Sequence, residues 1–208
     1  MDLLNFGNSS ITSTNDIKFL GIYVDKHLTF RPHVNSICSK VSKIVGLLFR
    51  LNNILPLQAL KTLYTSLFIP HLLYGIEIWY GIHQYNNERI FKLQKKKAIR
   101  AINCLPYNSH TNDYFKSMQL LKVEDIYKQR ALYFIFNSNS ITTHENIHEY
   151  NTRNSNNIVL PRFHRAKTQS TVFYKGIVLW NDLPQAIREI RFKGAFMNSL
   201  KTLFLNDY

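Results

Sequence analysis

The sequence predicts a mainly α-helical protein with one β-strand or hairpin near its N-terminus and a small α/β tail at its C-terminus. Two apolar stripes with helical spacing follow one another between residues 32 and 70. A run of β-branched and aromatic residues, 17–24 (IKFLGIYV), precedes them. With 208 residues, 45% of them apolar, the chain can bury the core of one domain, or of one domain and an appendage.

The predicted strand at 17–24 runs into the turn-like segment 25–33, and a helix is expected from Pro32. In that helix the apolar residues recur every three or four positions, which predicts one buried stripe. Pro56 suits the first turn of a second helix, where its missing N–H donor costs nothing. The stripe of the first helix consists of Val34, Ile37, Val41, Ile44, Leu48 and Leu51.

The second helix is expected to break at Pro70, with a third short helix over 70–80. The stretch 63–82 comes closest to a membrane span, but Glu77 would be costly at the centre of a bilayer. Two core helices that meet at Pro70 explain this stretch better than a span does. The stripe of the second helix consists of Leu57, Leu60, Tyr64, Leu67 and Phe68.

A strongly basic helix is expected from Glu88 to about Asn103, capped by Asn86 or Asn87. Residues 89–100 carry six basic and no acidic side chains, a density that repels itself unless something negative lies opposite. The pattern predicts a helix that contacts phosphates, and a solvated lysine-rich face is the alternative. The six residues are Arg89, Lys92, Lys95, Lys96, Lys97 and Arg100.

The C-terminal third changes in composition twice. A helix over 120–137 is followed by residues 137–157, which contain seven asparagines and few large apolar groups, as a linker does. Beyond them, 170–180 is expected to be strand-like and 183–205 helical. The segment just after the linker is basic and aromatic, which predicts a second phosphate-contacting patch. Its residues are Arg162, Arg165 and Lys167.

The overall charge limits the classes of partner. The chain has 26 Lys and Arg against 13 Asp and Glu, a formal charge of +13, which favours phosphate-rich partners. Cys38 and Cys104 form no C-x-x-C, so neither a disulfide framework nor a cysteine zinc site is expected. The N-terminal residues do not form a signal peptide. We therefore expect an intracellular protein, cytoplasmic or nuclear, that is neither secreted nor embedded in a membrane.

The string His144-Glu145-Asn146-Ile147-His148 matches the zinc-protease pattern H-E-x-x-H. The linker offers no apolar stripe to hold such a helix, and Asn151 and Asn154 replace the glycine and third histidine of the extended motif. The sequence also has no P-loop, no G-x-G-x-x-G and no G-x-S-x-G. We therefore expect no catalytic residue, no metal ligand and no cofactor within these 208 residues.

Five strings follow one another along nearly the whole chain. They are IKFLGIYVDKHLTFRPHVNSICSKVSK, LYTSLFIPHLLYGIEIWYG, KLQKKKAIRAI, HEYNTRNSNN and VFYKGIVLWNDLPQAIRE. Together, and in this order, they resemble the C-terminal part of the reverse transcriptase of non-LTR (LINE, jockey-like) retrotransposons. Each string alone has little specificity, so the shared order is what makes the resemblance specific.

The resemblance implies roles for several segments. Phe19, Leu20 and Gly21 would lie at the junction of palm and thumb, in a primer-grip-like element that steadies the primer end. The helices would form a thumb-like bundle that closes over an RNA–DNA or primer–template duplex and contacts its backbone. The expected order is a palm-edge strand and turn (1–30), a helical thumb-like region (31–136), an Asn-rich linker (137–160) and a basic tail module (161–208).

The sequence departs from the family in one respect that matters for activity. These polymerases bind two divalent metal ions through palm aspartates, including a Tyr-x-Asp-Asp motif, and no such motif occurs here. We expect a truncated RNA-directed DNA polymerase that is inactive alone, with Mg²⁺ required only by an intact family member. The palm and fingers of a parent polymerase would then be partners. The alternatives are a structural or protein-interaction module without a nucleic-acid role, and activity restored by a separate palm.

Overall fold

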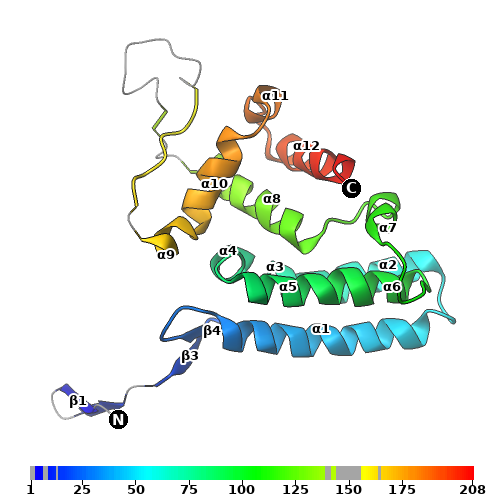
Figure 1. Cartoon of the computed structure of the whole chain (residues 1–208), viewed down its shortest axis with the longest axis horizontal. Helices are drawn as coiled ribbons and strands as arrows, with labels where there is room; N and C mark the ends of the chain where they lie inside the picture. Colours follow the sequence, from blue (N-terminus) through cyan, green and yellow to red (C-terminus); the bar gives the residue numbers. More distant parts are fainter. Residues whose placement is uncertain (1–2, 7–8, 13, 139–141, 144–155, 164) are drawn as a thin grey trace.

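The protein is a stack of helices with two short β-hairpins at one end (Figure 1). In Figure 1, helix α1 (Arg31–Leu51) forms one layer, α8 (Val123–Phe136) lies beyond a middle layer of helices, and α12 (Lys193–Asn206) is outermost. The predicted mainly α-helical class is confirmed. The computed structural model describes residues 3–6, 9–12, 14–138, 142–143, 156–163 and 165–208.

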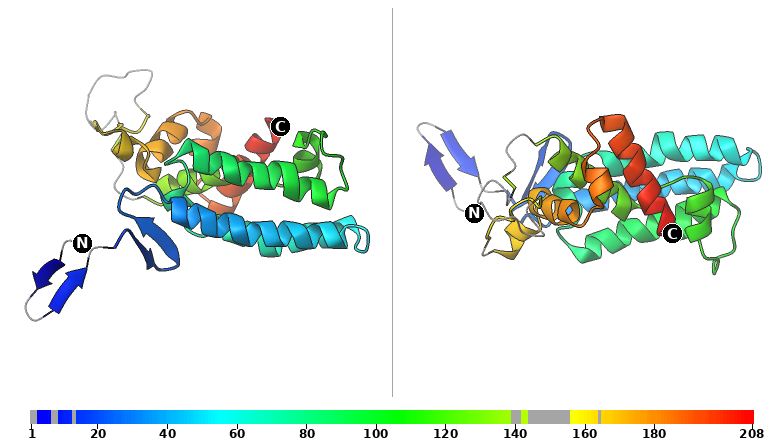
Figure 2. Two further views of the ribbon diagram at one scale, coloured as in Figure 1. Left: turned by 60° about the horizontal axis from the view of Figure 1, so that its bottom comes forward. Right: turned by 90° about the horizontal axis from the view of Figure 1, so that it is seen from above.

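The strands near the N-terminus form two antiparallel hairpins, of which the sequence predicts only the second. Strand β1 (Leu3–Phe6) pairs with β2 (Ser9–Thr12), and β3 (Asp16–Phe19) pairs with β4 (Ile22–Asp25). The first hairpin extends away from the helices in both views of Figure 2. Its strands were not predicted because serine and asparagine interrupt their apolar pattern.

The segment 17–24, predicted as one continuous strand, folds back on itself at Leu20 and Gly21. Both residues have positive φ, 45° and 83° respectively, as a two-residue type I′ hairpin turn requires. Glycine adopts positive φ without a steric penalty and leucine does not, so Gly21 is the residue that permits this turn. An apolar run with a turn in its middle has the composition of a single strand, which explains the error.

Asp25, at the end of β4, shapes the entry into α1. Its carboxylate accepts hydrogen bonds from the N–H groups of Thr29 (3.1 Å) and Phe30 (2.6 Å) and from the Thr29 hydroxyl (3.0 Å). Burial alone would raise the pKa of the Asp25 carboxyl, but these hydrogen bonds outweigh it and hold the pKa below its ordinary value. The helix then begins at Arg31, with Pro32 in its first turn as predicted.

The second predicted helix does not break at Pro70. It continues through α2 (Leu57–Leu63), a π-helical turn η1 (Tyr64–Phe68) and α3 (Ile69–Leu73), and the chain leaves the helix only at Tyr74. A wide π-turn already replaces the regular bonding pattern ahead of Pro70, so the missing proline donor does not end the helix. A short helix, α4 (Ile76–Trp79), follows.

Only part of the predicted second stripe is buried. Leu60, Tyr64 and Phe68, spaced by four residues, are fully buried, whereas Leu57 and Leu67 are 49% and 39% exposed. The first stripe follows its prediction more closely, since every one of its members is buried or half-buried. In this helix the apolar residues spaced by four positions are the buried ones, whereas the wider apolar pattern also includes exposed residues.

The predicted strand at 170–180 is a helix. Helix α10 (Val172–Asn181) packs against α8 because Gly176 allows the two to approach closely. A Cβ atom at Gly176 would lie 2.7 Å from the Ile135 side chain and 3.0 Å from the Ala131 carbonyl oxygen. This packing overrides the strand preference of the β-branched and aromatic residues, and the regular elements in the described residues of the expected α/β tail are all helices.

The tail contains three more helices. The single helix expected over 183–205 is divided into α11 (Gln185–Arg188) and α12, and α9 (Ala166–Gln169) precedes α10. One continuous core joins the tail to the helices before the linker, as shown by Phe196 of α12, which stacks on Phe136 of α8 with ring centroids 4.6 Å apart. The proposed segment boundaries remain predictions.

Several predictions concern residues that the structure describes only in part or not at all. The H-E-x-x-H histidines, His144 and His148, lie outside the described residues. Among the residues that are described, no three His, Cys, Asp or Glu side chains are grouped to hold a metal ion. Within the same residues, none of the helices has the length and apolar character needed to cross a membrane.

Candidate nucleic-acid interface

The basic residues predicted from sequence lie on one long helix. It consists of α5 (Gln84–Lys92), a π-helical turn η2 (Leu93–Ala98) and α6 (Ile99–Ile102). This helix runs beside α1, and the left view of Figure 2 shows the two along their length. Arg89 Nη1 donates to Asn35 Oδ1 near the start of both helices, and Cys104 Sγ lies 3.9 Å from the Asn52 carbonyl oxygen near the end of both. The two helices therefore run in the same direction.

The predicted cap of this helix is wrong. The helix begins at Gln84, so Asn86 and Asn87 lie inside its first turn. Asn86 is buried and donates from Nδ2 to the Thr29 carbonyl oxygen at 2.9 Å. Asn87 Oδ1 accepts from the Gly81 N–H at 3.1 Å. These asparagines bind the helix to neighbouring segments of the chain. In a sequence, an asparagine with this role looks the same as one that caps a helix.

The buried face of the helix is held by a glutamine that sequence reasoning missed. Gln94 is fully buried and donates from Nε2 to the Tyr64 hydroxyl (2.9 Å) and to the Leu121 carbonyl oxygen (3.0 Å). Its Oε1 accepts from the Val123 N–H, the first residue of α8, at 2.7 Å. Burial raises the pKa of the Tyr64 hydroxyl, and the bond from Gln94 acts in the opposite direction. Gln94 thereby joins three helices.

Three lysines point outward from the same helix. Lys92, Lys96 and Lys97 are exposed, while Lys95 is half-buried with its Nζ 5.3 Å from the centroid of the Phe91 ring. One acidic neighbour is present, since Glu88 lies 3.7 Å from Lys92 Nζ across an exposed i,i+4 pair. Such a surface pair contributes about 0.3–0.5 kcal/mol and leaves the face positive. These lysines are available to a ligand.

The arginines at the two ends of the helix are more engaged. Arg100 donates from Nη2 to the Ser109 carbonyl oxygen at 2.9 Å, and its guanidinium lies 5.3 Å from the centroid of the Tyr107 ring. Arg89 is bonded to Asn35, as described above, and is half-buried. Arg100 thus supports the loop after α6, so the six basic residues predicted to contact phosphates are not all equally free to bind a ligand.

The basic tail residues lie partly beside the start of this helix. Lys167 lines a cavity together with Ile82, two residues before α5, and its Nζ donates to the His27 carbonyl oxygen at 3.1 Å. Lys175 is half-buried and donates to the Gly81 carbonyl oxygen, and burial lowers the pKa of its amine. Arg162 and Arg165 are exposed. Part of the tail's positive charge therefore serves internal contacts.

The three residues expected to resemble a primer grip, Phe19, Leu20 and Gly21, form the tip of the second hairpin. Phe19 and Leu20 are 64% and 74% exposed, and Gly21 completes the turn. The hydroxyl of Tyr74 donates to the Leu20 carbonyl oxygen, which anchors the tip to the segment between α3 and α4. The tip presents apolar side chains and no charge, so it can contact a base, a sugar or an apolar partner but does not neutralise phosphate.

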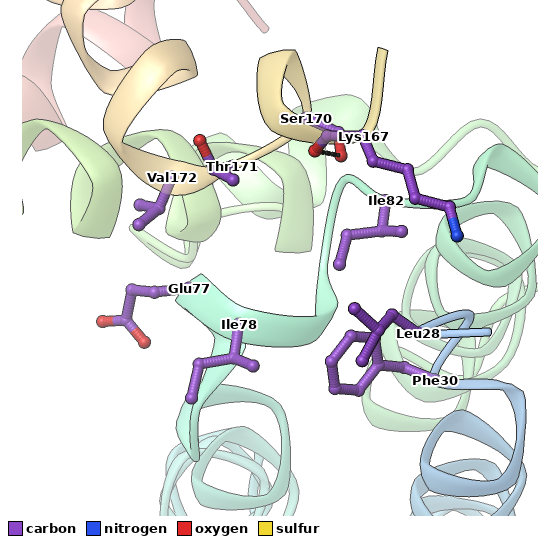
Figure 3. A pocket seen from close by; sticks show the side chains of 9 residues that line it. All are labelled: Leu28, Phe30, Glu77, Ile78, Ile82, Lys167, Ser170, Thr171 and Val172. Carbon is purple, nitrogen blue, oxygen red and sulfur yellow. Dashed lines mark hydrogen bonds between the residues drawn. The ribbon is translucent and has the colours of Figure 1, made fainter. Parts of the chain in front are cut away.

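An apolar pocket of about 320 Å³ lies between this end of α1, α4 and the start of α10 (Figure 3). Leu28 and Phe30 line it from the turn before α1, and Ile78 lines it from α4. In Figure 3 the charged ends of Lys167 and Glu77 lie at opposite sides of the pocket. Glu77 is also paired with Arg130, whose Nε lies 3.5 Å from its Oε1. No nucleophile with an adjacent base lines the pocket.

The groups exposed on the basic helix and near the pocket are suited to contact anions and bases. They are lysine ammonium and arginine guanidinium groups, which contact phosphate, and exposed aromatic rings. His33, the one buried histidine of the described residues, lies edge-on to Trp79 with centroids 5.7 Å apart, and neither of its nitrogens has a hydrogen-bond partner. Burial and the charge of Lys40 lower the pKa of His33 to about 4, so it stays neutral near pH 7.

The chain is similar in sequence to polymerases of mobile elements. It is 32% identical over 111 residues to a probable RNA-directed DNA polymerase from transposon BS of Drosophila melanogaster, a match that covers 52% of this chain and 12% of the relative. It is 26% identical over 132 residues to the RNA-directed DNA polymerase from mobile element jockey of Drosophila funebris, covering 62% of this chain and 14% of the relative.

A third relative belongs to another element. The chain is 31% identical over 80 residues to a retrovirus-related Pol polyprotein from type-1 retrotransposable element R1 of Bradysia coprophila, covering 37% of this chain and 8% of the relative. No protein-family model and no solved structure matches the chain. The predicted resemblance to non-LTR retrotransposon polymerases is therefore confirmed over about half of the chain, and the matched region is a small part of each relative.

Proposed function

We propose that this chain binds the sugar–phosphate backbone of RNA or DNA, including RNA–DNA and primer–template duplexes, with little dependence on base sequence. The observation that carries the proposal is the row of exposed lysines, Lys92, Lys96 and Lys97, on a helix whose other face is packed into the core. A rigid helix holds its cations at fixed spacing, and each neutralised phosphate releases condensed counterions. The proposed interface also includes Arg89, Lys95, Arg100 and the exposed tail residues Arg162, Arg165 and Lys167.

The proposal includes a limit on activity. The 208 residues contain no Tyr-x-Asp-Asp, and we propose that they form a non-catalytic part of a non-LTR retrotransposon polymerase. Mg²⁺ would be a cofactor of an intact polymerase and not of this part. The palm and fingers of such a polymerase would be its partners, and it would act inside the cell, in the cytoplasm or the nucleus.

A titration with labelled primer–template duplex tests the binding function. We expect affinity at low salt to fall steeply between about 50 and 200 mM salt, because several phosphates are neutralised. Replacing Lys92, Lys96 and Lys97 by glutamine should reduce both the affinity and the salt slope. A control that removes the same charge from α12 and the segment just before it, Arg191→Gln with Lys193→Gln and Lys201→Gln, should bind like the unmodified chain. Equal losses in both triple variants would show that only net charge matters.

An extension assay tests the limit on activity. Primed template, nucleotides and Mg²⁺ added to the isolated chain should give no extended primer. Any extension would contradict the non-catalytic assignment. Extension that appears only when a separately produced palm and fingers fragment is added would instead support complementation between the two parts.

A second candidate function is protein interaction, and the exposed apolar hairpin tip favours it. Phe19 and Leu20 at the tip, with Leu28 and Ile78 beside the apolar pocket, leave large apolar side chains in contact with solvent. Exposed apolar patches commonly mark interaction surfaces. If this is the function, Phe19→Ser with Leu20→Ser should abolish association with a palm and fingers fragment in sedimentation experiments, while the triple lysine variant keeps that association.

A further inference from the structure

A cavity of about 440 Å³ opens between the N-terminal ends of α1 and α5, on the helix that also carries the exposed lysines. Two arginines, one asparagine and one tyrosine line it: Arg31, Asn35, Tyr85 and Arg89. We propose that this cavity holds one unpaired nucleotide of a single-stranded RNA or DNA segment, with its phosphate between Arg31 and Arg89 and its base against the ring of Tyr85. The inference rests on the proposed backbone-binding function and gives it a defined site.

The two arginines, Arg31 and Arg89, supply positive charge that no ion pair among the described residues neutralises. Arg31 is exposed at the start of α1, while Arg89 is half-buried and held by its bond to Asn35 Oδ1. The Asn35 amide keeps its N–H donors for a ligand. A phosphate group, which accepts several hydrogen bonds from planar guanidinium groups, matches these donors.

Tyr85 supplies the surface for a base. Its side chain is 61% exposed, although the guanidinium carbon of Arg89 lies 5.7 Å from its ring centroid. Arg89 thus steadies the ring through a cation–π contact and leaves much of it open. Stacking of a base on an exposed aromatic ring is tolerant of base identity, which agrees with sequence-independent binding. The bases of a duplex are stacked on one another, so an unpaired nucleotide is the form that can use Tyr85.

The size and position of the cavity favour a nucleotide within a chain over a free one. Its volume lies within the roughly 300–1,000 Å³ of small-molecule sites, and the exposed Lys92 and Lys96 follow Arg89 along the same helix. These lysines can contact the phosphates of neighbouring nucleotides. A free nucleoside monophosphate has the same base and phosphate groups but gains nothing from the lysines, so its binding should be much weaker.

The test compares two oligonucleotides of equal charge. Fluorescence anisotropy would measure the affinity of the full chain for a labelled twelve-nucleotide oligoadenylate and for an abasic oligomer of the same length. In the unmodified protein the oligoadenylate should bind more tightly. Tyr85→Ala should reduce the ratio of the two affinities about tenfold, as expected for the loss of one stacked base, and Tyr85→Phe should restore it. Arg31→Gln should weaken binding of both oligomers and make the salt slope shallower by about one unit.

Tyr107→Ala is the matched control. Tyr107 is 83% exposed and lies 5.3 Å from the Arg100 guanidinium, so it has the same aromatic–arginine contact as Tyr85 without the two-arginine cavity. The ratio of affinities should stay within twofold of the unmodified protein in this variant. Circular dichroism melting would establish that each variant is folded.

The outcomes separate the inference from the function on which it rests. If the unmodified protein binds the primer–template duplex but neither oligomer, the nucleotide site is overturned and the backbone-binding function stands; if it binds none of the three, both proposals are wrong. If it binds both oligomers equally, or if Tyr85→Ala keeps the unmodified ratio, the backbone-binding function stands and the nucleotide site is overturned. The site is also overturned if Tyr107→Ala lowers the ratio as much as Tyr85→Ala does. If adenosine monophosphate competes as strongly as the oligoadenylate, the cavity is a free-nucleotide site and the single-strand assignment is wrong.

Discussion

The basic helix and the basic tail both carry an excess of positive charge but use it differently. On the helix, Lys92, Lys96 and Lys97 extend from a backbone whose opposite face is packed into the core. In the tail, Lys167 and Lys175 donate to backbone carbonyl oxygens of other segments. A count of charges does not show which charged side chains are free to bind a ligand, whereas the contacts show that part of the tail's charge stabilises the fold. This difference leads to four predictions.

Gln94→Leu should have the largest effect, because it removes the contact that places the basic helix. The N–H of Val123, the carbonyl oxygen of Leu121 and the hydroxyl of Tyr64 would each lose a buried partner. The free energy of unfolding should fall by about 3–5 kcal/mol in urea titrations. Gln84→Ala, at an exposed position of the same helix, should change it by less than about 0.5 kcal/mol. A small loss for Gln94→Leu would mean that the helix is placed by its apolar contacts alone.

Two triple variants test the comparison itself. Lys92→Gln with Lys96→Gln and Lys97→Gln should reduce duplex affinity about a hundredfold, since three free phosphate contacts are lost. Arg162→Gln with Arg165→Gln and Lys167→Gln removes the same charge, but Lys167 is already bonded to His27. That variant should lose about tenfold or less in the same anisotropy titration. Equal losses would show that the tail is as free to bind as the helix.

The protonation of His33 tests whether the core around α1, which packs beside the basic helix, excludes water. The pKa of His33 is about 4 in the folded chain, where burial is the main cause, against 6.5 when exposed. The unfolded chain therefore binds more protons below about pH 6.5, and this contribution to stability is lost progressively as the pH falls from 6.5 toward 4. From pH 6.5 to 5 the loss should be roughly 1–2 kcal/mol.

The matching variants make the His33 prediction specific. His33→Phe should flatten the dependence of the unfolding free energy on pH between 6.5 and 5. His110→Phe, at an exposed position, should keep the slope of the unmodified chain. If His33→Phe keeps that slope as well, the imidazole is reached by water and the core around α1 is less tightly packed than its buried side chains indicate.

Lys175→Met should have the smallest effect on stability. It distinguishes charged residues that stabilise the fold from those that bind nucleic acid. The substitution removes a bond to the Gly81 carbonyl oxygen, and burial already lowers the pKa of this amine. The free energy of unfolding should fall by about 1 kcal/mol. Duplex affinity should stay within twofold, although a positive charge is lost. A larger drop in affinity would place Lys175 among the residues that contact nucleic acid.

Periodicity predicted the helices well where burial alone decides their structure. The stripe of α1 has regular spacing and one buried side, so both its existence and its start follow from the sequence. The prediction of a strand at 170–180 was wrong because the contact with α8 determines the structure of α10. The sequence shows Gly176 but not the helix that packs against it. The turn at Leu20 and Gly21 was missed because the apolar run continues through it.

The candidate interface was predictable in composition but not in detail. The six basic residues of the helix identify its charged face directly. That Arg100 bonds Ser109, and that Lys167 bonds His27, depends on segments that are distant in sequence or irregular. Gln94 gave one signal, a polar side chain between the apolar positions Ile90 and Ala98, but nothing in the sequence names its three partners. The Arg31–Tyr85 cavity joins two helices 54 residues apart.

The π-helical turn η2 adds one residue to the basic helix, so the helix can tolerate a change in length at this place. Each residue of a regular α-helix turns the chain by about 100°, so a deletion there rotates one half of the helix relative to the other. A π-turn instead accommodates its extra residue within one widened turn, and the two halves keep the orientation of a regular helix. Deleting Lys97 is therefore expected to leave a regular helix in which Arg89 and Ile99 keep their faces, with the loss of one charge.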